Sequence, residues 1–185
     1  MPSLPTTSYA VLGLVAQLGS GSGYEIAQFA AQSIANFWPI AKSQVYGELS
    51  RLEELGFVAG SDVRQERLPD KRTYSITKNG RTAIKTWLED GPRERDRIRS
   101  GLLVKLFFAD KMRPESVMAM LEDYRGGAQR YAEELGSIVQ MLEPIPEAIH
   151  QKATARLGQK TALAAAEWAK ETMDELKHAG KGRKK

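Results

Sequence analysis

The chain has 185 residues, enough for one ordinary domain or two small ones, with 42% hydrophobic and 27% charged residues, as in a soluble globular protein. It has no cysteine, which excludes disulfides and thiol chemistry and is consistent with a cytosolic protein. The net charge of +4 is a weak sign of nucleic-acid binding, because residues 1–90 carry 9 Lys+Arg and 9 Asp+Glu.

Signals for targeting, metal binding and catalysis are weak in this sequence. The longest uncharged run, residues 1–24, contains polar residues and lacks a basic n-region, so we expect neither a signal peptide nor a membrane span. His150 and His178 lie far apart, and no His/Asp/Glu cluster has metal-ligand spacing. Glycine-rich phosphate loops and nucleophile elbows are absent as well. We therefore expect no metal, no cofactor and no enzymatic activity.

Two short helices are predicted at the start of the chain. The first covers residues 7–18, with Thr7 as its N-cap and a Gly-Ser-Gly turn after it. Ser22 and Glu25 match a capping box and open a second helix over about residues 22–36. Pro39 ends that helix, because the residue before a proline is disfavoured in the helical region.

Residues 42–58, KSQVYGELSRLEELGFV, predict a third helix of about thirteen residues closed by glycine, followed by a strand. Val45, Leu49 and Leu52 share one side of the helix and form its core face. The opposite side has a narrow strip of small residues with longer ones at its edges: Ser43, Gly47, Ser50, Lys42, Tyr46 and Arg51. Such a strip could lie close against a DNA major groove; the alternative is an ordinary surface helix.

A polar segment, RQERLPDKR, separates two strand-favouring segments, residues 57–59 and 73–76, and predicts a hairpin. The basic residues around its turn are Arg64, Arg67, Lys71 and Arg72. Three helices followed by a two-stranded basic hairpin is the arrangement of a winged helix-turn-helix, although a solvated hairpin tip would have the same composition. Thr77 then caps a fourth helix to about residue 90, with Ala83, Ile84, Trp87 and Leu88 facing inward.

Specific roles in DNA binding follow from side-chain chemistry. Residues expected to contact phosphates are Lys42, Tyr46, Tyr9 and Tyr24. Residues expected to read bases are Ser43, Gln44, Ser50 and Arg51, since glutamine pairs with adenine and arginine with guanine. The wing arginines suit a narrow minor groove or its flanking phosphates. For Tyr9 and Tyr24 the alternative is a packing role with an exposed hydroxyl.

Gly91-Pro92 marks a predicted domain boundary, and the remainder of the chain is strongly helical. A helix is expected over residues 93–109, a longer one from Pro114, and a last one over about residues 147–178. In the helix that begins at Pro114, the apolar positions alternate at spacings of four and three residues, which is a heptad pattern. Helices of the same chain could cover this surface, but three helices make a thin domain, so we expect a homodimer. The expected interface residues are Leu121, Tyr124, Tyr131, Leu135, Ile138, Leu142, Leu157 and Trp168.

Three blocks of sequence resemble the PadR-like transcriptional regulators: TSYAVLGLVAQLGSGSGYEIA, SQVYGELSRLEELGFV and KRTYSITKNGRTAIKTWL, which span residues 7–90 almost without a gap. The second half resembles the longer subfamily with a helical dimerisation domain. The resemblance implies a cytoplasmic prokaryotic regulator, usually a repressor, that binds a pseudo-palindromic operator as a dimer. It also implies that a small, often aromatic, molecule can lower DNA affinity. Gly47 and Ser50 depart from the family, which often has proline and a basic or bulky residue there.

The expected fold is therefore mainly α-helical. A winged helix-turn-helix DNA-binding domain occupies residues 1–90, a helical dimerisation domain residues 91–179, and a basic disordered tail residues 180–185. We predict a homodimeric, sequence-specific regulator that binds double-stranded DNA and does not associate with membranes. The resemblance alone implies a small aromatic effector. The alternative function is a winged-helix protein-interaction module. The aromatic side chains Phe37, Trp38, Trp87 and Trp168 could line a pocket for a flat ligand, or pack in the core.

Overall fold

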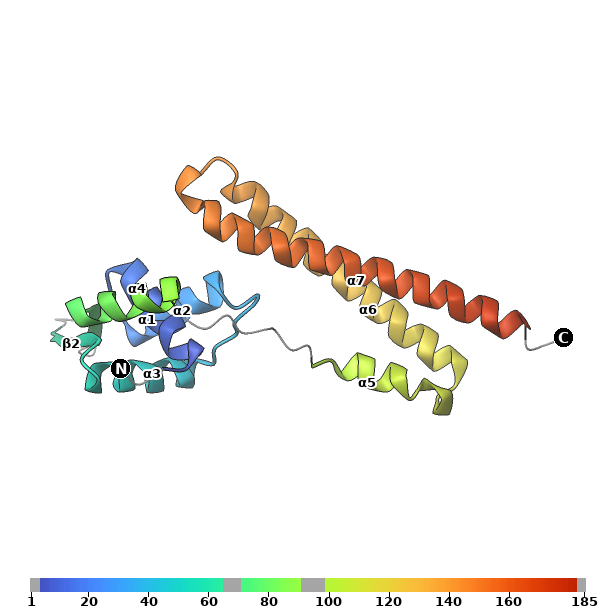
Figure 1. Cartoon of the computed structure of the whole chain (residues 1–185), viewed down its shortest axis with the longest axis horizontal. Helices are drawn as coiled ribbons and strands as arrows, with labels where there is room; N and C mark the ends of the chain where they lie inside the picture. Colours follow the sequence, from blue (N-terminus) through green and yellow to red (C-terminus); the bar gives the residue numbers. More distant parts are fainter. Residues whose placement is uncertain (1–3, 65–70, 91–98, 183–185) are drawn as a thin grey trace. The chain divides into compact units, whose positions relative to one another are not determined.

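A computed structural model describes residues 4–64, 71–90 and 99–182 of the chain (Figure 1). The chain forms two compact units, Met1–Arg95 and Asp96–Lys185, and each is described by itself. The predicted boundary at Gly91-Pro92 lies outside the described residues. The predicted fold class, a mainly helical chain with an N-terminal winged helix-turn-helix, is confirmed.

The helices and strands of the N-terminal unit, in chain order, are α1 (Thr6–Leu18), β1 (Ser20–Ser22), α2 (Gly23–Ser33), α3 (Lys42–Glu54), β2 (Val58–Val63), β3 (Lys71–Ile76) and α4 (Lys78–Asp90). The predicted extent of the third helix is confirmed. The prediction for Thr7 is wrong, since Pro5 takes the N-cap position and the Thr7 hydroxyl accepts a hydrogen bond from Trp38 Nε1–H at 3.2 Å. The second helix ends at Ser33, earlier than expected, because the N–H groups of Phe37 and Trp38 turn back to the carbonyl of Ile34.

The sheet has three strands in the order β1-β3-β2, with both pairings antiparallel, so the prediction of a two-stranded wing is incomplete. β1 is the Gly-Ser stretch that we expected only to end the first helix. Gly19 makes the turn with φ 77°, a left-handed conformation that favours glycine. Ser20 then pairs with Ser75 and Ser22 with Thr73, so the strand exists because β3 supplies its hydrogen-bonding partner.

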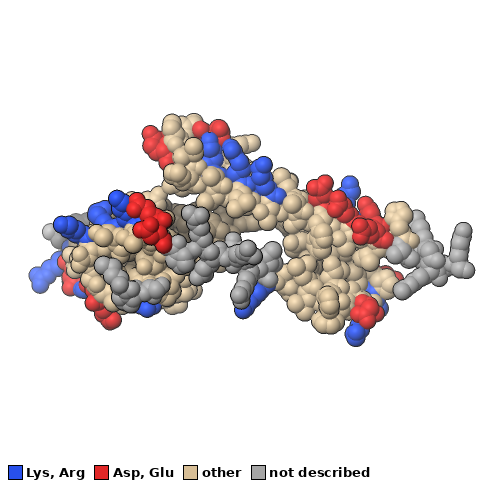
Figure 2. Space-filling model, viewed as in Figure 1, with Lys and Arg blue, Asp and Glu red and all other residues tan. Residues whose placement is uncertain are grey.

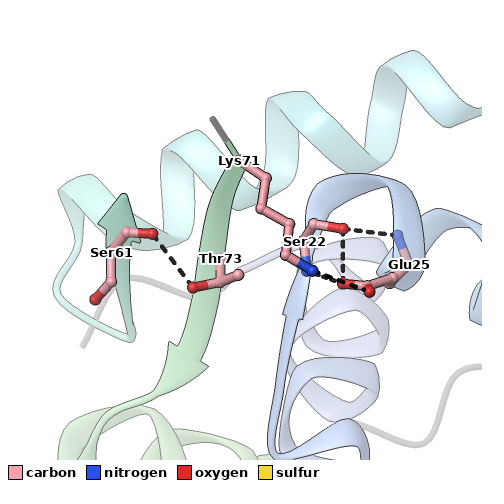
Figure 3. A network of polar contacts seen from close by, with 5 residues as sticks. All are labelled: Ser22, Glu25, Ser61, Lys71 and Thr73. Carbon is pink, nitrogen blue, oxygen red and sulfur yellow. Dashed lines mark hydrogen bonds and ion pairs between the residues drawn. The ribbon is translucent and has the colours of Figure 1, made fainter. Parts of the chain in front are cut away.

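Two predicted helix caps are confirmed, and Figure 3 shows the first of them, formed by Ser22 and Glu25. The Ser22 N–H and hydroxyl both donate to Glu25 Oε2 at 2.7 Å, and the Glu25 N–H donates to the Ser22 hydroxyl at 3.3 Å. Thr77 Oγ1 accepts from the Gly80 N–H at 3.1 Å and donates to the Gly56 carbonyl at 2.7 Å, which ties the start of α4 to the turn after α3.

The core of the N-terminal unit forms around α3. Val45, Leu49 and Leu52 are completely buried, as predicted, and pack with apolar residues of α1, α2, β2 and β3. Of the predicted inward face of α4, Ala83 is buried, whereas Leu88 is 69% exposed. The prediction for Leu88 is wrong because no described element covers the last turn of α4 on that side.

The C-terminal unit consists of α5 (Gly101–Phe107), the 3-10 turn η1 (Ala109–Lys111), α6 (Pro114–Leu142), the 3-10 turn η2 (Pro146–Ala148) and α7 (Ile149–Gly182). α6 begins and ends where the sequence predicts. α5 begins later than expected, with Ser100 as its cap accepting from the Leu103 N–H at 3.3 Å. α7 continues to Gly182, which corrects the predicted disorder of residues 180–182, because extending an existing helix costs less than starting one. Residues 183–185 lie outside the described residues.

α6 and α7 form a helical hairpin (Figure 1). Leu121 and Leu135 of α6 are completely or almost completely buried within this unit. The packing is close: a Cβ atom added at Gly158 of α7 would lie 2.8 Å from a methyl carbon of Leu135. Leu121 and Leu135 therefore belong to the core of one chain, which corrects the prediction that they contact a second copy.

The other predicted interface residues keep part of their surface. Leu157 is 68% exposed, and Tyr124 and Trp168 contact each other edge to face with ring centroids 6.0 Å apart. Tyr131, Ile138, Leu142 and Trp168 are half-buried. Figure 2 shows Lys and Arg side chains gathered over part of the hairpin. Across the turn of the hairpin, Lys152 and Arg156 of α7 both pair with Glu143.

Replacing Leu135 with alanine should lower the free energy of unfolding of the C-terminal unit by about 2–5 kcal/mol, because it leaves a cavity at a tightly packed position. Urea unfolding measured by circular dichroism checks this. Leu163→Ala is the matched control, since that side chain is 53% exposed, is not among the predicted interface residues, and its loss should cost little. Equal destabilisation by the two changes would contradict the internal role of Leu135.

The capping box should make stability depend on pH. Hydrogen bonds from the Ser22 N–H and hydroxyl, together with Lys71, lower the pKa of Glu25 from 4.5 to about 2. Because the folded pKa is depressed, the stabilisation is full above about pH 4.5 and is lost as the pH falls towards 2. Glu25→Gln should therefore cost about 0.5–1 kcal/mol in urea unfolding at pH 7 and much less near pH 2.

Glu54→Gln is the control for this experiment. Glu54 is exposed in the last turn of α3, and the structure shows no ion pair for it among the described residues. A cost of Glu25→Gln that stays constant from pH 7 to pH 2 would contradict the depressed pKa.

Candidate nucleic-acid interface

The outer face of α3 has the form that the sequence predicts. Lys42, Ser43, Gln44, Tyr46, Gly47, Ser50 and Arg51 are all exposed, opposite the buried face of the helix. A Cβ atom added at Gly47 would meet nothing within 4 Å, so the strip is open surface. α3 lies at the edge of the N-terminal unit in Figure 1. The helix can therefore approach a flat or grooved partner closely.

Three residues predicted to contact phosphates come together at the first turn of this helix. The Lys42 ammonium lies 4.6 Å from the centroid of the Tyr24 ring, a cation–π contact. Tyr46 packs against Gly23 at the start of α2, where a Cβ atom would lie 2.9 Å from its Cδ1. Both tyrosines are exposed, and Tyr24, Tyr46 and Lys71 help to line a shallow hollow of about 340 Å³. A larger residue at position 23 would therefore force the Tyr46 ring to move.

Tyr9 lies apart from this group. Its ring stacks on Trp87 of α4, with centroids 4.8 Å apart and planes 9° from parallel. This contact favours the alternative interpretation of Tyr9 as a residue that packs α1 against α4.

The basic residues of the wing are largely engaged within the chain. Lys71 Nζ lies 3.3 Å from Glu25 Oε1 (Figure 3). Arg72 contacts Glu53 Oε1 at 2.7 Å through Nη2 and Asp62 Oδ1 at 2.9 Å through Nη1, and these two carboxylates raise its pKa. Arg64 is exposed at the end of β2 and has no ion pair within the described part of the chain. Arg67 lies outside the described residues.

Two carboxylates that the sequence pattern does not predict, Glu48 and Glu53, hold α3 from its inner side. The fully buried Ser8 hydroxyl donates to Glu48 Oε2 at 2.6 Å and so ties α1 to α3. Glu53 Oε1 accepts from the Gly60 N–H at 3.0 Å and so ties α3 to β2. Gly60 is the signal that could have indicated the second contact, because a glycine inside a strand often marks the close approach of another group.

The remaining candidate residues have ordinary structural partners. Trp38 donates to Thr7, Trp87 stacks on Tyr9, and Trp168 contacts Tyr124. His178 Nδ1 lies 2.6 Å from the carbonyl oxygen of Asp174 one turn earlier. In residues 4–64, 71–90 and 99–182, no group of three His, Cys, Asp or Glu side chains could hold a metal ion. None of the helices in these same ranges is both long and apolar enough to cross a membrane.

Comparison with known proteins links both units to transcriptional regulators. Residues 11–86 match the transcriptional regulator PadR-like family, and residues 98–177 match the family described as virulence activator alpha C-term. The chain is 26% identical over 115 residues to the negative transcriptional regulator PadR of Bacillus subtilis, covering 62% of this chain and 63% of PadR. It is 34% identical over 71 residues to a probable transcriptional regulator of Mycobacterium tuberculosis, 38% of either chain. The alignments thus span less than two thirds of either relative.

Solved structures show the same fold over almost the whole chain. The B. subtilis PadR structure in complex with operator DNA has a TM-score of 0.84 and 19% identity, covering 93% of this chain and 99% of that one. The Vibrio cholerae virulence activator AphA has a TM-score of 0.71 and 24% identity, covering 93% and 98%. The N-terminal unit therefore carries a domain of the transcriptional regulator PadR-like family, and the chain shares its mainly helical, winged-helix fold with solved PadR-like regulators.

Proposed function

We propose that this protein is a cytoplasmic transcriptional repressor that binds a pseudo-palindromic operator as a homodimer. The observation that carries the proposal is the exposed strip of small residues along α3, with its buried face fixing which side points outward. B. subtilis PadR, whose fold is similar, has been crystallised with operator DNA.

In this proposal the two copies of α3 enter successive major grooves about 34 Å apart. Lys42, Tyr24 and Tyr46 meet the phosphates beside the first turn of the helix, since these three side chains lie close together there. Gln44 and Arg51 are the longest side chains able to reach base edges. Ser43 and Ser50 supply short hydroxyl contacts where the helix lies closest to the groove.

Exposed apolar side chains support the dimer. Leu103, Val104, Phe107 and Phe108 line an open hollow of about 570 Å³ on the surface of α5, and Phe107 is 82% exposed. Leu157 of α7 is similarly exposed. Apolar surface of this extent in one small unit is typical of an interface. We propose that a second copy covers it.

The proposal includes a small aromatic effector that lowers DNA affinity. Its support is the structural likeness to B. subtilis PadR, which has also been crystallised with p-coumaric acid, at a TM-score of 0.78 and 19% identity.

A winged-helix protein-interaction module is the second candidate function. The pairing of Lys71 and Arg72 with carboxylates favours it, because it reduces the positive charge that the wing offers to phosphates. Salt dependence separates the two candidates. Binding through phosphates releases counterions from the DNA and therefore weakens steeply as the salt concentration rises.

Lys42→Ala should weaken binding to all DNA sequences alike and flatten the dependence of log K on log salt by about 0.9, the value expected for one phosphate contact. Fluorescence anisotropy with labelled DNA from upstream of the gene itself checks this at several salt concentrations. Lys85→Ala is the control, since Lys85 lies on α4 and pairs with Glu89 at 3.9 Å. If the wild type forms no salt-sensitive complex with this DNA, the interaction-module function is favoured instead.

Leu157→Arg should convert the dimer to monomers, because it places a charge on a mostly exposed apolar side chain of the proposed interface. Sedimentation velocity at micromolar concentration measures this. Leu88→Arg is the matched control: that leucine is equally exposed but lies in the N-terminal unit. A monomeric wild type would refute the homodimer, and an unchanged sedimentation coefficient for the variant would remove Leu157 from the interface.

A further inference from the structure

We infer that Arg72 is a positioning residue, clamped by Glu53 and Asp62, that sets the wing relative to the recognition helix α3 and does not itself bind phosphate. This inference rests on the proposed function in DNA binding. We call Glu53, Gly60, Asp62 and Arg72 the wing clamp; they join the last turn of α3 to β2 and β3.

One carboxylate oxygen is shared between both strands of the wing. Glu53 Oε1 accepts from the backbone N–H of Gly60 in β2 at 3.0 Å and from Arg72 Nη2 in β3 at 2.7 Å. Arg72 Nη1 donates to Asp62 Oδ1 at 2.9 Å, and Asp62 is the direct cross-strand partner of Arg72 in the sheet register. The guanidinium therefore uses both of its terminal nitrogens inside the protein.

Gly60 makes this geometry possible. A Cβ atom added there would lie 2.7 Å from Arg72 Nε and 2.8 Å from Arg72 Nη2. A side chain at position 60 would therefore overlap both the guanidinium of Arg72 and the carboxylate of Glu53, and these two side chains would have to shift. The glycine has no positive φ to explain it, so the close approach accounts for it.

Charge balance separates Arg72 from the other candidate contacts. Two carboxylates face one guanidinium, so the clamp carries a net negative charge, which disfavours a phosphate beside Arg72. Arg51 and Arg64 are exposed and have no ion pair among the described residues. Within that part of the chain, no paired carboxylate opposes the approach of a phosphate to either of them.

The position of the clamp defines its effect on DNA binding. α3 and the wing contact different parts of an operator, so the distance between them determines whether both fit one sequence at once. A flexible wing would still bind phosphates but would fit many sequences equally. The clamp is therefore expected to govern discrimination between sequences more than affinity for DNA in general.

The test compares Arg72→Gln, Glu53→Gln and the double variant, with Arg64→Gln as the matched control. Two duplexes serve as probes: the one most enriched by the wild type from a random-sequence pool, and a scrambled duplex of the same composition. Arg72→Gln should reduce the preference for the enriched duplex about tenfold and leave the salt slope unchanged. In the Glu53→Gln background, Arg72→Gln should cause no further loss of preference for the enriched duplex, because the two residues act through one contact.

Arg64→Gln should instead weaken both duplexes alike and flatten the salt slope by about 0.9, as expected for a lost phosphate contact. The inference is overturned if Arg72→Gln behaves like Arg64→Gln, or if its effect on discrimination adds to that of Glu53→Gln.

A measurement without DNA separates failure of the clamp from failure of the proposed function. Hydrogen exchange of the Gly60 amide, followed by NMR, should be faster in Arg72→Gln and Glu53→Gln and unchanged in Arg64→Gln. If the wild type binds neither duplex, the proposed function fails; faster exchange at Gly60 would still support the clamp. Unchanged exchange at Gly60 in both Arg72→Gln and Glu53→Gln would overturn the inference of a wing clamp.

Discussion

Burial of the inner face of α3 is the constraint on which the rest of the N-terminal unit depends. Val45, Leu49 and Leu52 are completely inaccessible, and burying each such side chain contributes about 1.5–3 kcal/mol. Because these three residues share one side of the helix, their burial fixes how α3 is rotated about its axis. The strip containing Ser43, Gly47 and Ser50 is thereby held at the surface without any contact of its own.

Hydrophobic burial is non-directional, so polar contacts are needed to fix where the helix lies along and across the core. Glu48 ties α3 to Ser8 of α1, and Glu53 ties it to the wing. Glu25 joins the start of α2 to the wing through Lys71. Carboxylates thus hold α2, α3 and the wing together, and two of them pair with cations that residue type alone would assign to nucleic-acid binding.

The helical hairpin of the C-terminal unit buries only part of its own apolar surface. Close approach at Gly158 lets α7 pack against Leu135, while Leu157 and the apolar residues of α5 remain exposed. The heptad pattern of α6 predicts that a partner helix exists. The heptad pattern does not show whether that partner helix belongs to the same chain or to a second copy, since either partner requires the same spacing of apolar residues.

The sequence by itself determined the features that local physics controls. The bounds of α3 and α6, the capping box at Ser22 and the Thr77 cap all depend on contacts within a few residues, and all are as predicted. Only the tertiary structure decided that β1 is a strand, that Tyr9 stacks on Trp87 and that Arg72 is paired with Glu53. These depend on groups far apart along the chain, and residue type and periodicity do not specify which distant groups become neighbours.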